Sequence, residues 1–260
     1  MKTNIVVTGA KGRMGTTIAG LVKQNPELSL AGVVERQGNV EGLEQYNCMV
    51  SDNLHELLTK NENCVVIDFT SPEVSMDVAA ICADTGAAAV MGTTGFSSEE
   101  LEKLEKTARQ VRLFWAPNMS VGINVLLRIL PELINMLGDK YDLELMEIHH
   151  KFKKDAPSGT ALKLAQVLAA SQGLDLDEKG VFCRKGIIGE RQESEIGVQT
   201  LRGGDVVGDH TVYLLGPGER IEVTHRAHSR ETFAQGAIRA ASWLVEQKPG
   251  KLYTMADIFA

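Results

Sequence analysis

The stretch from Asn4 to Gly15, which reads NIVVTGAKGRMG, decides the fold. Asn4–Thr8 is a short run rich in β-branched residues, which predicts a buried strand, and Met14–Gln24 has the apolar spacing of a helix. Three glycines connect them with the spacing GxxGxxG rather than the common GxGxxG. Glycine lets the backbone turn tightly and approach a pyrophosphate, whose charge the following helix N-terminus stabilises. The stretch therefore indicates a dinucleotide-binding α/β unit, against the alternative of an ordinary turn.

An acidic residue follows at the distance that a dinucleotide site requires. A second predicted strand, Leu28–Val34, ends at Glu35, about 20 residues beyond Gly15. A carboxylate there accepts hydrogen bonds from the ribose hydroxyls of NAD, whereas an arginine can meet the 2′-phosphate of NADP. Because Arg36 follows Glu35 directly, we expect NADH, NADPH or both as cofactor. The alternative for Arg36 is a solvated surface charge.

Further strands and helices alternate through the first half of the chain. We expect strands at Val65–Phe69, Ala87–Met91 and Val111–Trp115, with helices at Val74–Asp84 and Ser98–Arg109. The strands show little internal alternation of polar and apolar residues, which is typical of a parallel sheet covered by helices on both faces. The first part of the chain is therefore predicted to be a Rossmann-like domain.

Two of these strands are followed by small and hydroxyl-bearing residues. The first group is Gly92, Thr93 and Thr94, and the second is Ala116, Pro117, Asn118 and Met119. In open α/β sheets, ligands lie beyond the carboxyl ends of the strands, so both groups are candidates to contact ribose and nicotinamide. Each group taken alone is also compatible with an ordinary loop.

The sequence pattern changes near residues 120–122. We expect a long apolar helix at Val121–Leu137, disturbed at Pro131, then a strand at Leu143–Ile148 and a helix at Gly159–Gln172 that Gly173 closes. A strand-rich stretch with glycine turns follows at residues 181–223, and a last helix at Glu231–Val245. The glycine turns are expected at residues 203–204, 208 and 216–218. We predict a dinucleotide-binding domain of residues 1–121 and 231–260, and a smaller α+β domain with a mixed sheet at 122–230.

Composition narrows the class of protein. The chain carries 27 Lys plus Arg against 34 Asp plus Glu, a net charge of −7, which argues against nucleic acid as a partner. No apolar run approaches the ~20 residues of a membrane span, and the first residues lack the apolar core of a signal peptide. We therefore expect a cytoplasmic protein without a membrane partner. Cys48, Cys64, Cys82 and Cys183 form no CxxC pair, and we expect them to be buried free thiols.

A basic segment lies within this acidic chain. Residues 147–160 read EIHHKFKKDAPSGT, and five of the six residues from His149 to Lys154 are His or Lys. Such groups donate protons and stabilise developing negative charge, and the helix that starts after Ser158 presents N–H groups suited to a carboxylate. The alternative is a solvated basic loop. We expect no metal, because neighbouring residues of a strand, such as His149 and His150, point in opposite directions and no acidic partner is expected nearby.

These segments together resemble the 4-hydroxy-tetrahydrodipicolinate reductase (dihydrodipicolinate reductase) family of bacterial lysine biosynthesis. The most specific match is residues 147–160, which fit the family pattern EXHHXXKXDAPSGT. The resemblance covers essentially the whole chain, and the other matching segments are residues 9–15, 68–72, 92–95, 117–122 and 218–233.

The resemblance implies an activity and a role for individual residues. Hydride from NADH or NADPH would reduce C4 of a small cyclic dicarboxylate with loss of water, His149 would be the acid–base residue and Lys153 a proton donor. His150, Gly159 and Thr160 would hold a substrate carboxylate. The cofactor would be bound by Gly9, Ala10, Lys11, Gly12, Arg13, Met14, Glu35, Arg36, Gly92, Thr93, Thr94, Ala116, Pro117, Asn118 and Met119. The family also implies a homotetramer assembled through a sheet of the second domain.

Two other functions remain open on the residues alone. Another nicotinamide-dependent dehydrogenase would keep the glycine loop, but has no need of the His-His-Lys and Ser-Gly-Thr groups. A non-catalytic dinucleotide sensor could dispense with His149 and Lys153, and both are present.

The pair Glu35–Arg36 leads to a test of cofactor choice. We expect Arg36→Ala to weaken NADPH binding by about tenfold while NADH binding changes little, because only NADPH carries the 2′-phosphate. Titrating the wild type and the variant with both cofactors measures this. Equal losses for the two cofactors would contradict the assignment of Arg36.

Overall fold

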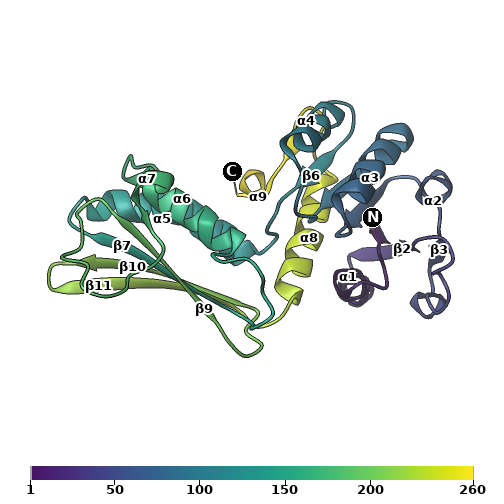
Figure 1. Cartoon of the computed structure of the whole chain (residues 1–260). Helices are drawn as coiled ribbons and strands as arrows, with labels where there is room; N and C mark the ends of the chain where they lie inside the picture. The colour runs from purple at the N-terminus through teal and green to yellow at the C-terminus, as the bar shows by residue number, and fades with distance from the viewer. Residues whose placement is uncertain (1, 260) are drawn as a thin grey trace. The chain divides into compact units, whose positions relative to one another are not determined.

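The structure is a computed structural model that describes residues 2–259, and their contacts divide the chain into two compact units (Figure 1). Unit 1 extends to Val121 and resumes at Arg230, whereas unit 2 is Gly122–Ser229. Each unit has its own sheet and its own apolar core. The dinucleotide-binding and substrate-binding roles suggested by the sequence stay predictions for these units.

Unit 1 contains a parallel sheet with the strand order β12-β6-β5-β4-β1-β2-β3. Its strands are β1 Thr3–Thr8, β2 Leu28–Val34, β3 Met49–Ser51, β4 Cys64–Asp68, β5 Ala88–Met91, β6 Leu113–Trp115 and β12 Leu252–Tyr253. Every neighbouring pair is parallel. The chain builds outward from β1 to β3 and then crosses back to β4, which makes the boundary between β1 and β4 a topological switch point. The Rossmann-like prediction is confirmed.

Helices cover both faces of this sheet (Figure 1). They are α1 Arg13–Gln24 and α8 Glu231–Leu244 on one face, and α2 Leu54–Lys60, α3 Pro72–Thr85 and α4 Ser98–Thr107 on the other. Along β1, Ile5 and Val7 pack in the core on the side of α1 and α8, whereas Val6 packs in the core on the side of α2, α3 and α4. Because both sides are buried there, the three central residues of the strand are all apolar.

Several short elements of unit 1 were not predicted. Besides β3, β12 and α2, they include the 3₁₀ helix Glu44–Tyr46 and α9 Met255–Ile258. Two or three strand residues are too few to show a hydrophobic period, so their position depends on pairing with β2 and β6.

Unit 2 contains a mixed sheet, as predicted, with the strand order β11-β10-β7-β9-β8. Its strands are β7 Asp142–His149, β8 Gly180–Val181, β9 Ile196–Arg202, β10 Gly208–Gly216 and β11 Glu219–Ala227. β7 pairs antiparallel with β10 and parallel with β9. Helices α5 Val121–Leu137 and α6 Gly159–Ser171 pack on one face of the sheet, and the short helix α7 Leu176–Lys179 follows α6.

Some expectations about unit 2 and the cysteines were wrong. The disturbance expected at Pro131 stays a prediction, because α5 contains this proline and continues on both sides of it. Gly208 is not a turn but the first residue of β10, paired with Ala227. Cys64 and Cys82 are buried, but Cys48 is half-buried and Cys183 is exposed, since it follows β8 on an irregular segment.

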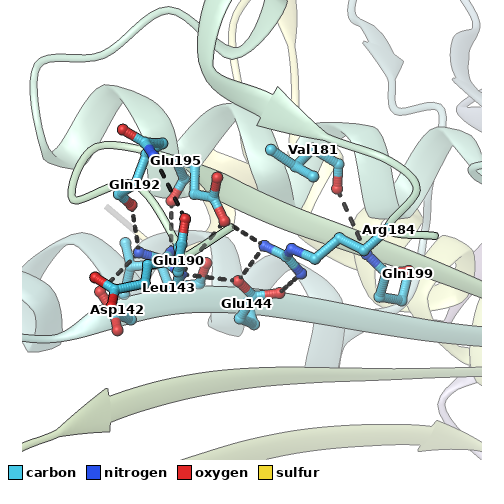
Figure 2. Close-up of polar contacts among 10 residues, drawn as sticks. Asp142, Leu143, Glu144, Val181, Arg184, Glu190, Gln192, Glu195 and Gln199 are labelled. Carbon is cyan, nitrogen blue, oxygen red and sulfur yellow. Dashed lines mark hydrogen bonds and ion pairs between the residues drawn. The ribbon is translucent and has the colours of Figure 1, made fainter. Parts of the chain in front are cut away.

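That irregular segment, residues 182–195, is fixed to the sheet by ion pairs (Figure 2). Arg184 donates from Nη1 and Nη2 to the two carboxylate oxygens of Glu144 on β7, both at 2.8 Å, and also pairs with Glu195 at 2.7 Å. Arg191 reaches Glu144 at 3.1 Å and Asp142 at 2.7 Å. A Cβ at Gly197 would lie 1.8 Å from the Glu144 carboxylate, so glycine on β9 makes room for this network.

No helix within residues 2–259 is long and apolar enough to cross a membrane.

Candidate active site

The predicted cofactor-binding residues lie at the carboxyl ends of four parallel strands of unit 1. Gly9, Ala10, Lys11 and Gly12 connect β1 to α1, and Arg13 and Met14 begin α1; Glu35 and Arg36 follow β2; Gly92, Thr93 and Thr94 follow β5; Ala116, Pro117, Asn118 and Met119 follow β6. In open α/β sheets this edge is where ligands bind. The topology thus brings the four groups to one edge of the sheet.

The glycine loop has the geometry of a phosphate cradle. Gly9 has a φ of +59°, and its carbonyl oxygen accepts a hydrogen bond of 2.9 Å from Gly12 N–H. A Cβ at Gly15 would lie 2.2 Å from the same carbonyl oxygen, so α1 packs against the loop more closely than any side chain allows. Gly12 caps α1 without a side-chain hydrogen bond, which leaves first-turn N–H groups without a side-chain acceptor. This donor set fits the pyrophosphate of a dinucleotide.

Glu35 ties the end of β2 to the glycine loop. Its Oε2 accepts from Lys11 N–H at 3.1 Å, and its Oε1 accepts from Arg36 N–H at 3.2 Å. Each carboxylate oxygen has a second lone pair, so both can still accept from a ribose hydroxyl. Arg36 is exposed beside it.

Four predicted cofactor residues have buried side chains. Ala10, Ala116 and Met119 belong to the apolar core of unit 1, and the Thr93 hydroxyl donates to the buried Asp68 at 3.0 Å. Their side chains are therefore occupied inside the unit, and only their backbone remains for a ligand.

In unit 2, the predicted catalytic and substrate residues lie on the connection from β7 to α6. His149 ends β7, His150 and Lys153 follow it, and Gly159 and Thr160 begin α6. Ser158 caps α6, because its Oγ accepts from Ala161 N–H at 3.1 Å. Lys153 lies 2.9 Å from Asp155 Oδ1, and a buried nitrogen of His150, Nδ1, has no hydrogen-bond partner among the described residues.

A buried carboxylate, Glu147, joins the two ends of this connection. Its Oε2 accepts from His149 Nδ1 at 2.5 Å, and its Oε1 accepts from Ser158 N–H at 3.0 Å. Arg202 on β9 donates to both oxygens at 2.8 Å. Burial alone would raise the pKa of Glu147, but the hydrogen bonds from His149, Arg202 and Ser158 outweigh it and hold that pKa well below its usual range.

The expectation that no acidic partner lies near His149 was wrong. Residues i and i+2 of a strand point to the same face, so Glu147 and His149 lie side by side on β7. An acidic side chain therefore does lie beside His149, and the absence of a metal stays an expectation.

A second histidine packs against His149. The rings of His149 and His210 meet edge to face with centroids 5.3 Å apart, and His210 Nε2 lies 3.3 Å from Ser158 Oγ. His210 is buried, and burial together with nearby His149 lowers its pKa to about 4. A Cβ at Gly208 would lie 2.9 Å from His149 Nε2, so glycine leaves room for the imidazole.

The sequence alone assigned no role to the side chains of Glu147, Ser158 or His210. The strand alternation at residues 147 and 149 was a usable signal for Glu147. His210 on β10 lies opposite Glu147 on β7, and no local sequence pattern predicts the register of these two strands.

The chain is similar over its length to proteins of one family. Models described as dihydrodipicolinate reductase, N-terminus and C-terminus, match residues 3–119 and 122–259. The 4-hydroxy-tetrahydrodipicolinate reductase of Oleidesulfovibrio alaskensis is 60% identical to this chain, over 99% of this chain and 100% of the relative. That of Nitratidesulfovibrio vulgaris is 59% identical, over 100% of both chains. The chain belongs to the dihydrodipicolinate reductase family.

A solved structure of the dihydrodipicolinate reductase family shares the fold. The dipicolinate-bound dihydrodipicolinate reductase of Paenisporosarcina sp. TG-14 has a TM-score of 0.77 and 23% identity, and the match covers 98% of each chain. The fold of that protein therefore matches both unit 1 and unit 2 of this chain.

The buried His210 makes stability depend on pH. Its pKa of about 4 in the folded chain is below the 6.5 of an unperturbed histidine, so the unfolded chain binds more protons between these values. Stability therefore falls on acidification from pH 6.5 towards 4, by up to about 3 kcal/mol from this residue. Urea unfolding of wild type and His210→Gln from pH 7.5 to 4 measures it. The variant should lose less stability than the wild type, and parallel curves would rule out this role.

Proposed function

We propose that the chain is an NADH- or NADPH-dependent 4-hydroxy-tetrahydrodipicolinate reductase of the diaminopimelate route to lysine, acting in the cytoplasm, where reduced nicotinamide is available. Substrate, reduced cofactor and one proton become tetrahydrodipicolinate, oxidised cofactor and water. The observation that carries this proposal is the Glu147–His149 pair on the same connection as Lys153 and the start of α6. Family membership supports the choice of substrate.

The edge of the unit 1 sheet is the proposed cofactor site. When bound, the nicotinamide cofactor supplies the hydride that reaches C4 of the substrate. The glycine loop from Gly9 to Met14 would hold the pyrophosphate, Glu35 and Arg36 the adenosine ribose, and the backbone near Gly92–Thr94 and Ala116–Met119 the remainder. The absence of a side-chain cap at Gly12 supports this assignment.

In unit 2, Glu147 prepares His149 for proton transfer. Its ionised carboxylate holds Nδ1 as the donor of a 2.5 Å hydrogen bond, so Nε2 is the nitrogen that exchanges a proton with the substrate. Arg202 and Ser158 N–H keep Glu147 ionised and in place. Glu147 is thus a positioning residue and His149 the acid–base residue.

Lys153 supplies positive charge and a proton. Loss of the 4-hydroxyl as water leaves a conjugated imine, and hydride addition at its C4 then builds negative charge on the substrate. An ammonium group stabilises this charge and donates the proton that completes the product. His150, with its buried Nδ1, and the α6 N-terminus at Gly159 and Thr160 would hold a substrate carboxylate. Two carboxylates on the substrate explain a basic segment in an acidic chain.

Nicotinamide absorbance tests the activity. Freshly prepared product of dihydrodipicolinate synthase is added to enzyme with NADH or NADPH, and cofactor oxidation is followed. Oxidation supports the reductase. Cofactor binding without oxidation would favour a sensor, and oxidation only with other carbonyl compounds would favour a different dehydrogenase.

The role of Lys153 has a matched control in Lys151, an exposed lysine two residues earlier. We expect Lys153→Ala to lower kcat by about 100-fold, as for loss of a general acid, while the dissociation constant of NADH stays the same. Lys151→Ala should keep kcat within twofold of the wild type. An unchanged kcat for Lys153→Ala would rule out a catalytic lysine.

We also propose a homotetramer assembled through the unit 2 sheet. Helices α5 and α6 pack on one face, whereas Met146, Leu201 and Tyr213 alternate with core residues and point to the other. Leu201 is 45% exposed, which suits a face covered by another copy.

Light scattering tests the tetramer. The wild type should have four times the 28.3 kDa mass of one chain, and Leu201→Glu should reduce it by placing a charge in the interface. Met136→Glu changes an apolar residue on α5 that is 80% exposed, and it should leave the mass unchanged. A monomeric wild type would refute the proposal.

A further inference from the structure

Four side-chain hydroxyls surround the carboxylate of Asp68, a fully buried residue at the end of β4. Thr8 and Thr70 donate to Oδ1 at 2.6 and 2.8 Å, and Thr93 donates to Oδ2 at 3.0 Å. Ser75 contacts Oδ2 as well, and its hydroxyl lies 2.8 Å from that of Thr93. A carboxylate buried away from water is tolerated when several donors satisfy it, and this one has donors on both oxygens.

The donors come from four different parts of unit 1. Thr8 ends β1, Thr70 lies between β4 and α3, Ser75 is in the first turns of α3, and Thr93 follows β5. Asp68 therefore lies at the topological switch point between β1 and β4, where open α/β sheets bind their ligands. None of the reaction steps proposed above uses this group.

The network contacts the first of the predicted cofactor-binding segments directly. Thr8 precedes Gly9 in the chain, and a Cβ at Gly9 would lie 2.9 Å from the Thr70 methyl group. Gly9 in turn accepts the hydrogen bond from Gly12 that closes the glycine loop. A shift of Thr8 and Thr70 would therefore move the first turn of the phosphate cradle.

The network also reaches the segments that follow β5 and β6. Gly92 N–H donates to the Asp68 carbonyl at 2.9 Å, beside the side-chain bond from Thr93. The Thr93 carbonyl accepts from Trp115 Nε1 at 3.0 Å, and Trp115 directly precedes Ala116. Asp68 thus binds residues in or next to two of the four segments assigned to the cofactor, and it reaches a third through Thr93 and Trp115.

We propose that Asp68 is a positioning residue of the cofactor site: its carboxylate, by collecting the hydroxyls of Thr8, Thr70, Ser75 and Thr93, sets the relative positions of the loops after β1, β5 and β6. It touches no ligand itself, because it is fully buried and its oxygens are occupied. The proposal rests on the proposed function only in assigning a nicotinamide cofactor to unit 1.

Asp68→Asn tests the role with little change in size. The amide NH₂ replaces one acceptor oxygen with a donor, so the hydroxyls on that side must reorient and the loops that carry them shift. We expect the dissociation constant of NADH to rise about tenfold, because the displaced loops no longer match the bound cofactor. At saturating NADH, the KM of the dicarboxylate should stay within twofold, since the residues proposed to bind it belong to unit 2, whereas kcat should fall because the shifted loops also hold the cofactor.

Two controls separate positioning from general stability. Ile67→Val, at the preceding residue of β4, removes a buried methyl group and leaves the hydroxyls alone, so the NADH dissociation constant should stay within twofold. Thr8→Val removes one donor and should weaken NADH binding, whereas Thr8→Ser keeps the hydroxyl and should restore it.

NADH fluorescence titration measures binding without turnover, which keeps the two proposals distinguishable. A wild type that binds NADH but does not reduce the dicarboxylate refutes the proposed reaction, and the Asp68 test still stands. An Asp68→Asn variant with wild-type NADH affinity overturns the positioning role. So does an Ile67→Val variant that loses as much affinity as Asp68→Asn, or a wild type that binds neither NADH nor NADPH.

Discussion

A carboxylate buried away from water must be surrounded by hydrogen-bond donors, and this requirement organises both units of the chain. Asp68 in unit 1 collects hydroxyls from the ends of neighbouring strands, and Glu147 in unit 2 collects His149, Arg202 and the backbone of Ser158. Both are fully buried. Asp68 ends β4 and binds residues next to the loops assigned to the cofactor, and Glu147 lies near the end of β7, which leads into the connection assigned to the substrate. Satisfying each carboxylate therefore also shapes the proposed site.

The two carboxylates act on different kinds of partner. Asp68 receives neutral hydroxyls, among them those of Thr8, Thr70 and Thr93. Glu147 receives a histidine and an arginine, and the charge of Arg202 keeps it ionised so that it can orient His149. The chain as a whole has a net charge of −7, whereas the segment around His149 and Lys153 is rich in basic residues.

Much of the fold was predictable because buried parallel strands are apolar throughout and their helices are long enough to show a period. Leu28–Val34 was predicted with its observed bounds, and α1 was missed by one residue at its start. The strands β3 and β12 were missed, because so few residues show no pattern. The exposure of Cys183 was missed for a related reason: the irregular segment that carries it is held by Arg184 and Arg191, through carboxylates on the distant strand β7.

The sequence by itself determined the glycine loop and the connection from His149 to Thr160, because both are local: consecutive residues form a turn, a cap or a strand end whatever surrounds them. It also determined the family to which those motifs belong. Only the tertiary structure decided that Thr93 is buried against Asp68 and that Arg202 and His210 meet Glu147 and His149. These contacts join residues dozens of positions apart through strand register, and register depends on how the whole sheet packs against its core.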